Sequence, residues 1–153
     1  NIKTILKFIV LLRKFYWKIF KPVSIGARAI LINSDKEFLL VKHNYSSQWY
    51  LPGGKIGKGE GLVKGLEREL TKEVGMGRYS LDRLLGTYLN RYESKNDYIS
   101  VFVISDFEIK ATKHFEIDNI CFYSYDNLPN GISPGTRKRI EEYLDKKKID
   151  YNW

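Results

Sequence analysis

Two carboxylates beside a glycine turn are the residues of this 153-residue chain whose types and spacing could do chemistry. Glu69 and Glu73 stand four residues apart, so on a helix they share one face and lie one turn from each other. Such a pair offers hard oxygen ligands to Mg²⁺, which accepts few protein ligands and keeps waters or substrate phosphates. Lys72 stands where a third carboxylate would complete a cation-binding face.

The stretch before these glutamates, GGKIGKGEG at 53–61, predicts a loop that approaches a bound group closely. Gly53 and Gly54 have no Cβ, so their backbone groups are open to a ligand. Glu60, at the junction of loop and helix, can reach the same region. Arg68 lies beside Glu69 and can orient its carboxylate.

The elements that must position these residues follow from periodicity. LVKGLERELTKEV at 62–74 predicts a helix that ends at Gly75, with an apolar side expected to be buried: Val63, Leu66, Leu70 and Val74. We expect strands at 24–32, 37–43, 84–92, 97–109 and 119–128, the first two as a hairpin, and a last helix at 133–148. Helices mixed with hairpin-connected strands predict an α/β fold with a mixed sheet.

Residues 1–21 form a separate amphipathic unit, and 22–153 are expected to form one domain. Residues 1–21 contain six basic and no acidic residues of a chain whose net charge is +8, which leaves 20 basic and 18 acidic residues in 22–153. Nucleic-acid binding by the domain is therefore not expected. Two partners remain open for the basic helix: its own domain or a second copy, as in a homodimer, and an anionic membrane that it would contact peripherally.

Composition sets further bounds. Apolar residues make up 43% of the chain, which indicates a globular protein. The single cysteine, Cys121, cannot form an internal disulfide, so a cytoplasmic location is expected. His43 and His114 lie outside zinc-ligand spacing, and we expect His43 at the surface.

Residues 54–76 resemble the signature of the Nudix hydrolases. That signature reads Gly, five residues, Glu, seven residues, Arg-Glu-aliphatic, one residue, Glu-Glu, one residue, Gly, aliphatic. It is filled in register by Gly54, Glu60, Arg68, Glu69, Leu70, Glu73, Gly75 and Met76. Only Lys72 departs, because it replaces the first glutamate of the Glu-Glu pair. The resemblance implies an α/β/α sandwich with a mixed sheet.

The resemblance also implies an activity: Mg²⁺- or Mn²⁺-dependent hydrolysis of the pyrophosphate bond in a nucleoside diphosphate linked to another moiety. By position, Glu69 and Glu73 would be catalytic metal ligands and Arg68 their orienting partner. Gly54 would offer a backbone carbonyl to a metal, and Glu60 would support the loop or hold a second ion. An acid from outside the signature often joins the metal site, and the turn between two strands supplies two candidates, Asp97 and Glu93.

Lys72 leaves the activity open, because it places a cation where the family usually has a metal ligand. At about 4 Å and an effective dielectric of ~20, one pair of charges is worth roughly 4 kcal/mol, a ceiling for a flexible lysine. Metal binding could be weakened but retained, or the ammonium could stand in for one metal and bind a substrate phosphate. The alternative function is a catalytically weak Nudix domain that serves as a nucleotide-binding or interaction module.

Arg28 interrupts an apolar strand and is flanked on its own face by the small residues Ser24 and Gly26. A strand arginine between small residues could line a pocket and bind substrate phosphate. An ion pair with an acid across the sheet is the equal alternative.

Overall fold

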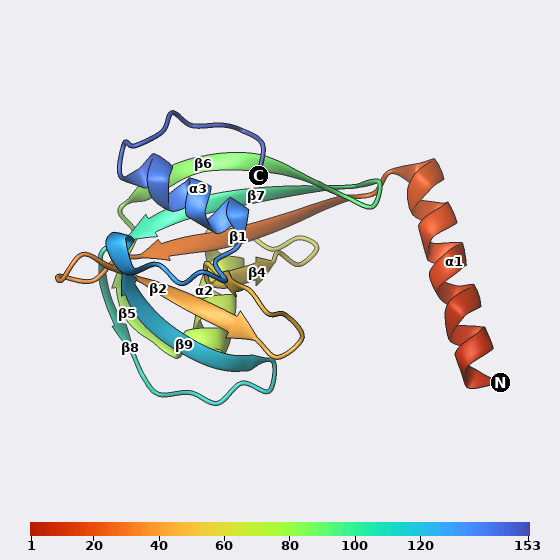
Figure 1. Ribbon diagram of the computed structural model, residues 1–153, viewed down its shortest axis with the longest axis horizontal. Coiled ribbons are helices and arrows are strands. Elements are labelled where there is room, and N and C mark those ends of the chain that lie inside the picture. Colours follow the sequence, from red (N-terminus) through yellow and green to blue (C-terminus); the bar gives the residue numbers. More distant parts are fainter.

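The computed structural model describes every residue from 1 to 153 and shows helices on both sides of strands that form two sheets and a ribbon (Figure 1). Its elements are α1 (Ile2–Phe20), β1 (Val23–Leu31), β2 (Glu37–His43), β3 (Trp49–Tyr50), β4 (Gly53–Lys55), α2 (Leu62–Val74), β5 (Met76–Ser80), β6 (Arg83–Tyr92), β7 (Lys95–Ile104), β8 (Asp106–Ile109), β9 (Ile117–Ser124), a 3₁₀ turn (Tyr125–Asn127) and α3 (Pro134–Tyr143).

The larger sheet is mixed, as the sequence predicts. Its strand order is β4-β1-β7-β6. β1 runs parallel to β7 from the pair Val23–Asn96 to the pair Leu31–Ile104, whereas β4 and β6 lie antiparallel to their neighbours. A parallel pair needs a long crossover, and here the whole segment from β2 to β6 connects β1 to β7.

The expected hairpin of β1 with β2 is wrong. The two strands share one isolated bridge, Ile32–Phe38, and then separate, because β2 joins β3 and β9 in a second sheet. Both strands carry runs of buried residues instead of a simple alternation, which is typical of strands covered on both faces. Each strand therefore needs packing partners on two sides, which a two-stranded ribbon cannot provide.

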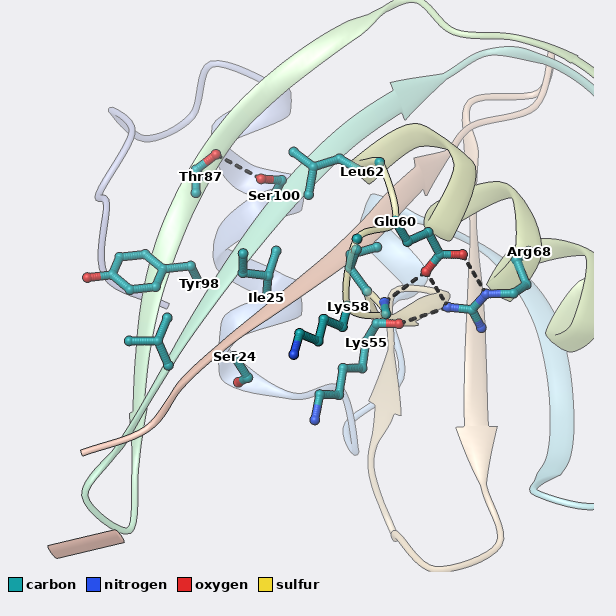
Figure 2. Close-up of a pocket in the computed structure, with 15 residues that line it drawn as sticks. Ser24, Ile25, Lys55, Lys58, Glu60, Leu62, Arg68, Thr87, Tyr98 and Ser100 are labelled. Carbon is teal, nitrogen blue, oxygen red and sulfur yellow. Dashed lines mark hydrogen bonds and ion pairs between the residues drawn. The ribbon is translucent and has the colours of Figure 1, made fainter. Parts of the chain in front are cut away.

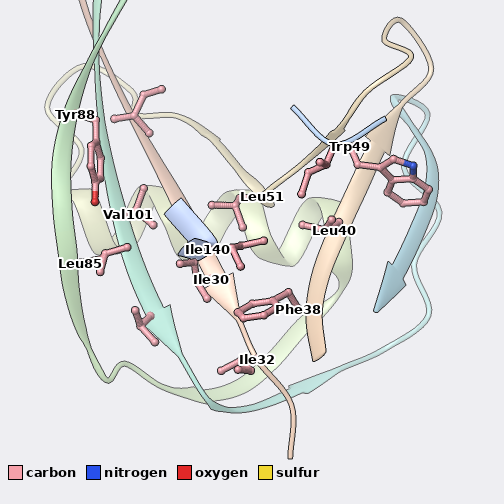
Figure 3. Close-up of a cluster of buried hydrophobic side chains, with 13 residues drawn as sticks. Ile30, Ile32, Phe38, Leu40, Trp49, Leu51, Leu85, Tyr88, Val101 and Ile140 are labelled. Atoms are coloured by element: carbon pink, nitrogen blue, oxygen red, sulfur yellow. The ribbon is translucent and has the colours of Figure 1, made fainter. Parts of the chain in front are cut away.

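Two hydrophobic clusters fill the faces of these strands. One contains Ile30, Phe38 and Leu40, and it is closed by Ile140 of α3; Figure 3 shows these side chains pointing toward one another from the two sheets. The other contains Leu31 and the residues of β1 on the same face of the strand, together with the apolar face of α2. The α/β/α arrangement thus follows from strands whose successive residues enter different cores.

α2 has the predicted boundaries, and Gly75 ends it in the left-handed conformation with φ of 66°. Leu66, Leu70 and Val74 are buried, as expected. Val63 is exposed, so its expected burial is wrong. Glu69 and Glu73 lie on the buried face of α2, and a helix that faces these two side chains toward the domain turns Val63 toward solvent. α2 packs against β4 and β1, which brings the glutamates to the glycine turn.

The expected strand at 97–109 is divided at Ser105. β7 belongs to the larger sheet, whereas β8 pairs with β5, a strand that is not among the expected ones. The expected C-terminal helix also ends early, at Tyr143, and Asp145 takes the left-handed conformation with φ of 56°. The chain then returns along β6, where the Leu89 amide donates to Tyr151 and the Trp153 amide donates to Leu89.

A buried polar cluster fixes this C-terminal segment. Arg139 is fully buried, its guanidinium lies 3.9 Å from the centre of the Tyr88 ring, and it pairs with Glu142 at 3.1 Å. Glu142 also accepts the Tyr88 hydroxyl at 2.8 Å and the Asp150 amide at 2.8 Å. Arg139 donates to the Asn152 carbonyl at 3.3 Å. The cluster therefore joins α3, β6 and the chain end.

α1 is a helix over Ile2–Phe20, as the periodicity predicts, and none of its residues is buried. Figure 1 shows it apart from the body of the domain, beside the tip of the β6–β7 hairpin. None of the three helices combines the length and the apolar character that a membrane span requires.

We predict that Arg139→Ala lowers the free energy of unfolding by about 3–5 kcal/mol, because it leaves the Glu142 carboxylate buried without its cation. Lys138→Ala, which removes the neighbouring exposed cation that pairs with Asp150 at 3.5 Å, should change it by less than about 0.5 kcal/mol. Urea unfolding of both variants provides the comparison. Equal losses would contradict the role assigned to the buried cluster.

Candidate active site

Glu69 and Glu73 lie on the buried face of α2, where their exposed fractions are 9% and 5%. Both project toward the turn at Gly53 and Gly54. A Cβ on Gly54 would lie 2.5 Å from Oε2 of Glu69, so the carboxylate occupies the space that the glycine leaves open. The turn and the helix therefore form one unit, as the spacing predicts.

Glu73 is held by two hydrogen bonds. Its Oε2 accepts the Gly53 amide at 2.9 Å, and its Oε1 lies 3.2 Å from Nε2 of His43. The expected surface position of His43 is wrong: the imidazole is 5% exposed and stacks on the Tyr45 ring with centroids 5.0 Å apart. Its position at the end of β2, facing α2, could not be read from sequence spacing.

Arg68 joins the glycine-rich loop to α2. It donates from Nε to Oε1 of Glu60 at 2.8 Å, and from Nη2 to Oε2 of Glu60 at 2.9 Å and to the Lys55 carbonyl at 3.1 Å. The Arg68 side chain and the Gly57 amide together lower the pKa of Glu60 to about 2, and Glu60 and Glu69 in turn raise the pKa of Arg68. The loop is thus held by a charge-assisted pair.

Glu69 Oε1 is contacted by two cations. Nη1 of Arg68 donates to it, and Nζ of Lys72 lies 3.5 Å away. The Lys72 side chain is 45% exposed, so its ammonium reaches the carboxylate while remaining in contact with water. The position that departs from the signature therefore faces Glu69 directly and partly neutralises it.

The donor chemistry suits a hard cation, but only a small ligand set is present. No cluster of three or more His, Cys, Asp or Glu side chains that could hold a metal occurs in the structure. Glu69 and Glu73 offer carboxylate oxygens, which are the donors that Mg²⁺ prefers when it also keeps waters or substrate oxygens. Both Glu60 oxygens are engaged by Arg68 and Gly57, and Asp97 accepts the Ser24 hydroxyl at 2.7 Å.

Arg28 and Asp97 meet Gly54 around a small pocket of about 160 Å³. Asp97 lies within β7, not in the turn, and pairs with Ser24 of β1. Arg28 donates to the Leu51 carbonyl at 2.8 Å, and no acid pairs with its guanidinium. Lys55 and Lys95 complete a cationic lining that the strand pattern alone did not identify.

Glu93, the other candidate acid from outside the signature, lies at the tip of the β6–β7 hairpin and pairs with Lys14 of α1 at 3.7 Å.

A larger pocket of about 1040 Å³ lies against the Glu60–Arg68 pair. Its wall includes Ile25, Leu62 and Tyr98, and Figure 2 shows Lys55 and Lys58 projecting beside it. Neither Glu69 nor Glu73 lines this pocket. It shares Ser24 and Lys55 with the small pocket, whereas Arg28 lines only the small one.

Comparison with known proteins places this site in a family. The NUDIX domain model matches residues 23–143. A protein of Bacillus subtilis (strain 168), provisionally named 8-oxo-dGTP diphosphatase, is 35% identical over 118 residues, which are 77% of this chain and 78% of that protein. The human 8-oxo-dGDP phosphatase NUDT18 is 34% identical over 59 residues, which are 37% of this chain and only 18% of that protein.

Solved structures share the fold. The MutT protein from Methanosarcina mazei Go1 superimposes with a TM-score of 0.67 at 24% identity, covering 84% of this chain and 98% of that one. A UDP-X diphosphatase superimposes with a TM-score of 0.68 at 23% identity, covering 82% of this chain and 64% of that one. The domain match across residues 23–143 and the Bacillus relative show that the chain belongs to the Nudix family and is a pyrophosphohydrolase.

Proposed function

We propose that the enzyme hydrolyses the pyrophosphate bond of a nucleoside diphosphate linked to another moiety, and that it depends on Mg²⁺ or Mn²⁺. The observation that carries the proposal is the burial of Glu69 and Glu73 against the Gly53–Gly54 turn within a Nudix domain. The relatives named for 8-oxo-dGTP and 8-oxo-dGDP support an oxidised purine nucleotide as the first substrate to test.

Each side chain has a distinct part in this proposal. The cation, when bound, would activate water and offset charge on the leaving phosphate. Glu69 Oε2, which faces Gly54, is the open ligand atom, while Arg68 fixes the other oxygen of the same carboxylate. Glu73 is the second ligand and is oriented by the Gly53 amide and His43.

The remaining residues divide between the loop and the small pocket. Because the Arg68 guanidinium pairs with both Glu60 oxygens, a loop-supporting role is favoured for Glu60 over a role as ligand to a second ion. Each Glu73 oxygen makes a single hydrogen bond and keeps a lone pair for a cation. Gly54 and Asp97 line one pocket, which supports a contribution of the Gly54 carbonyl and the Asp97 carboxylate near the cation. Arg28 would bind phosphate oxygens there, since a guanidinium forms directional bonds to phosphate.

Lys72 lowers the affinity for the cation in this proposal, because its ammonium competes for Glu69. The same ammonium can contact a substrate phosphate that lies at Glu69. The contact also favours a second candidate function, a catalytically weak Nudix domain that binds nucleotides or partners without turnover. Nucleotide binding without Mg²⁺- or Mn²⁺-stimulated release of phosphate products would support that second function.

We further propose a cytoplasmic enzyme with two parts, residues 1–21 and 22–153. The lone free cysteine, Cys121, fits a reducing compartment. The basic residues concentrated in 1–21 support a peripheral membrane contact or a homodimer through this segment, and the nearly balanced charge of the domain argues against nucleic acid as partner.

We predict that Gly54→Ala lowers kcat about 100-fold, because the new Cβ would displace the Glu69 carboxylate. The backbone of Gly54 is not in the left-handed conformation, so the Gly54→Ala variant should fold normally. Gly61→Ala is the matched control, since a Cβ there meets nothing within 4 Å. Steady-state kinetics with 8-oxo-dGTP and Mn²⁺ would test this, and full activity of Gly54→Ala would contradict it.

Lys72→Glu should raise Mn²⁺ affinity on the order of tenfold, since attraction replaces repulsion beside Glu69; the half-exposed position keeps the gain well below the Coulomb ceiling. Lys64→Glu changes the same charge on the same helix, away from Glu69, and should have less than about a twofold effect. Titration calorimetry measures both. An equal gain of Mn²⁺ affinity in the two variants would show that affinity follows the net charge of the protein and not the contact of Lys72 with Glu69.

Arg28→Met should raise KM about tenfold with little change in kcat, if the guanidinium contributes binding that is equal in the ground and transition states. Lys58→Gln removes a cation from the larger pocket and should leave KM within about twofold. A larger rise of KM in Lys58→Gln than in Arg28→Met would instead indicate that the substrate phosphate binds at the larger pocket.

A further inference from the structure

The exposed apolar surface of α1 has no partner in the structure. None of its residues is buried, Trp17 is partly exposed, and twelve other apolar side chains are between 41% and 76% exposed. They are Ile2, Ile5, Leu6, Phe8, Ile9, Val10, Leu11, Leu12, Phe15, Tyr16, Ile19 and Phe20. A contiguous apolar surface of this length marks an interaction site.

The distribution of charge around α1 indicates the kind of partner. At 100° per residue, Lys3, Lys7, Lys14 and Lys18 fall within about 60° of one another, whereas apolar residues occupy almost all of the remaining circumference. A helix that packs on a protein core needs an apolar stripe of only about 100°. One protein groove would therefore leave much of this surface in water, while the boundary between lipid headgroups and acyl chains can cover it.

The contacts of α1 with its own domain leave this surface free. Lys14 pairs with Glu93 at 3.7 Å, and Lys95 lies 5.6 Å from the centre of the Trp17 ring. Both contacts involve the tip of the β6–β7 hairpin and the basic side of the helix or its margin. The centre of the apolar arc, at Ile9 and Tyr16, contacts none of the domain's buried clusters.

Docking of α1 into a second copy is disfavoured by charge. The larger pocket described above carries Lys55 and Lys58 beside its apolar wall, so it would place lysines against a helix that has only basic charges. Anionic lipid headgroups instead complement the lysine stripe, and each lysine near such a surface contributes about a fivefold gain in binding. Arg13 lies within the apolar arc, over the Trp17 ring at 4.8 Å, and its long side chain can extend to the headgroups.

We propose that α1 is an interfacial anchor that lies in the surface of an anionic bilayer, with its lysines at the headgroups and its apolar arc at the acyl boundary. This assigns the partner left open above to the membrane. The anchor does not rest on the hydrolase function, because α1 contributes no side chain to the candidate site. It also sets the β6–β7 hairpin, which carries Lys95 and Asp97 of the small pocket, at the membrane side of the enzyme.

The test is sedimentation of the full chain with vesicles of phosphatidylcholine alone or with about 30% phosphatidylglycerol. We expect binding to the anionic vesicles that is at least about tenfold stronger than to the neutral ones. Replacing Lys3, Lys7 and Lys18 by Gln should weaken it on the order of 100-fold. The matched control replaces Lys64, Lys113 and Lys148 of the domain by Gln, which gives the same net charge and should retain binding.

Ile9→Asp, at the centre of the apolar arc, should abolish vesicle binding while leaving the circular dichroism of the domain unchanged. Absence of binding by the unsubstituted chain, or equal binding to neutral and anionic vesicles, would overturn the proposal. So would a dimer in lipid-free ultracentrifugation that Ile9→Asp dissociates, because a second copy would then cover the arc. Hydrolysis measured without lipid should be the same for all these variants, so failure of the anchor is distinguishable from failure of the proposed reaction.

Discussion

The close approach of the Glu69 carboxylate to the Cα of Gly54 is the constraint on which the rest of the site depends. It fixes the separation between α2 and β4, and this separation also allows Glu73 to reach the Gly53 amide and Arg68 to reach the loop carbonyl at Lys55. Apolar packing below the glutamates, from Leu66, Leu70 and Val74, holds the helix at that distance. Burial of the two carboxylates is tolerated because Glu73 accepts the Gly53 amide and lies within hydrogen-bonding distance of His43, while Glu69 pairs with Arg68 and Lys72.

Lys72 adds positive charge to the site beside Glu69. Two carboxylates close together repel one another, and a bound cation normally relieves that repulsion. Here Arg68 and Lys72 supply positive charge to Glu69, so side chains of the chain itself offset part of that repulsion. In the proposed reaction, the positive charge that stabilises the Glu69 carboxylate would oppose binding of a divalent ion at the same carboxylate.

Much of the site could be predicted, because its parts lie within 23 consecutive residues and helical spacing decides which of them share a face. The boundaries of α2 and the association of Glu69, Glu73 and Arg68 with the turn follow from local pattern. His43 could not be placed, since its contact with Glu73 depends on β2 lying beside α2. The β1–β2 hairpin was expected for a related reason: short-range signals do not reveal that each strand is covered on both faces.

The parallel pairing of β1 with β7 has a consequence for how the chain folds. Ser24 and Asp97, which pair across these strands, are 73 residues apart, so the larger sheet cannot close until most of the domain is available. Contacts of such high sequence separation are associated with slow folding, because loop-closure entropy is lost before any packing is gained. During synthesis on the ribosome, α1 would emerge long before the domain matures, so capture of the nascent helix by lipid could precede completion of the catalytic fold.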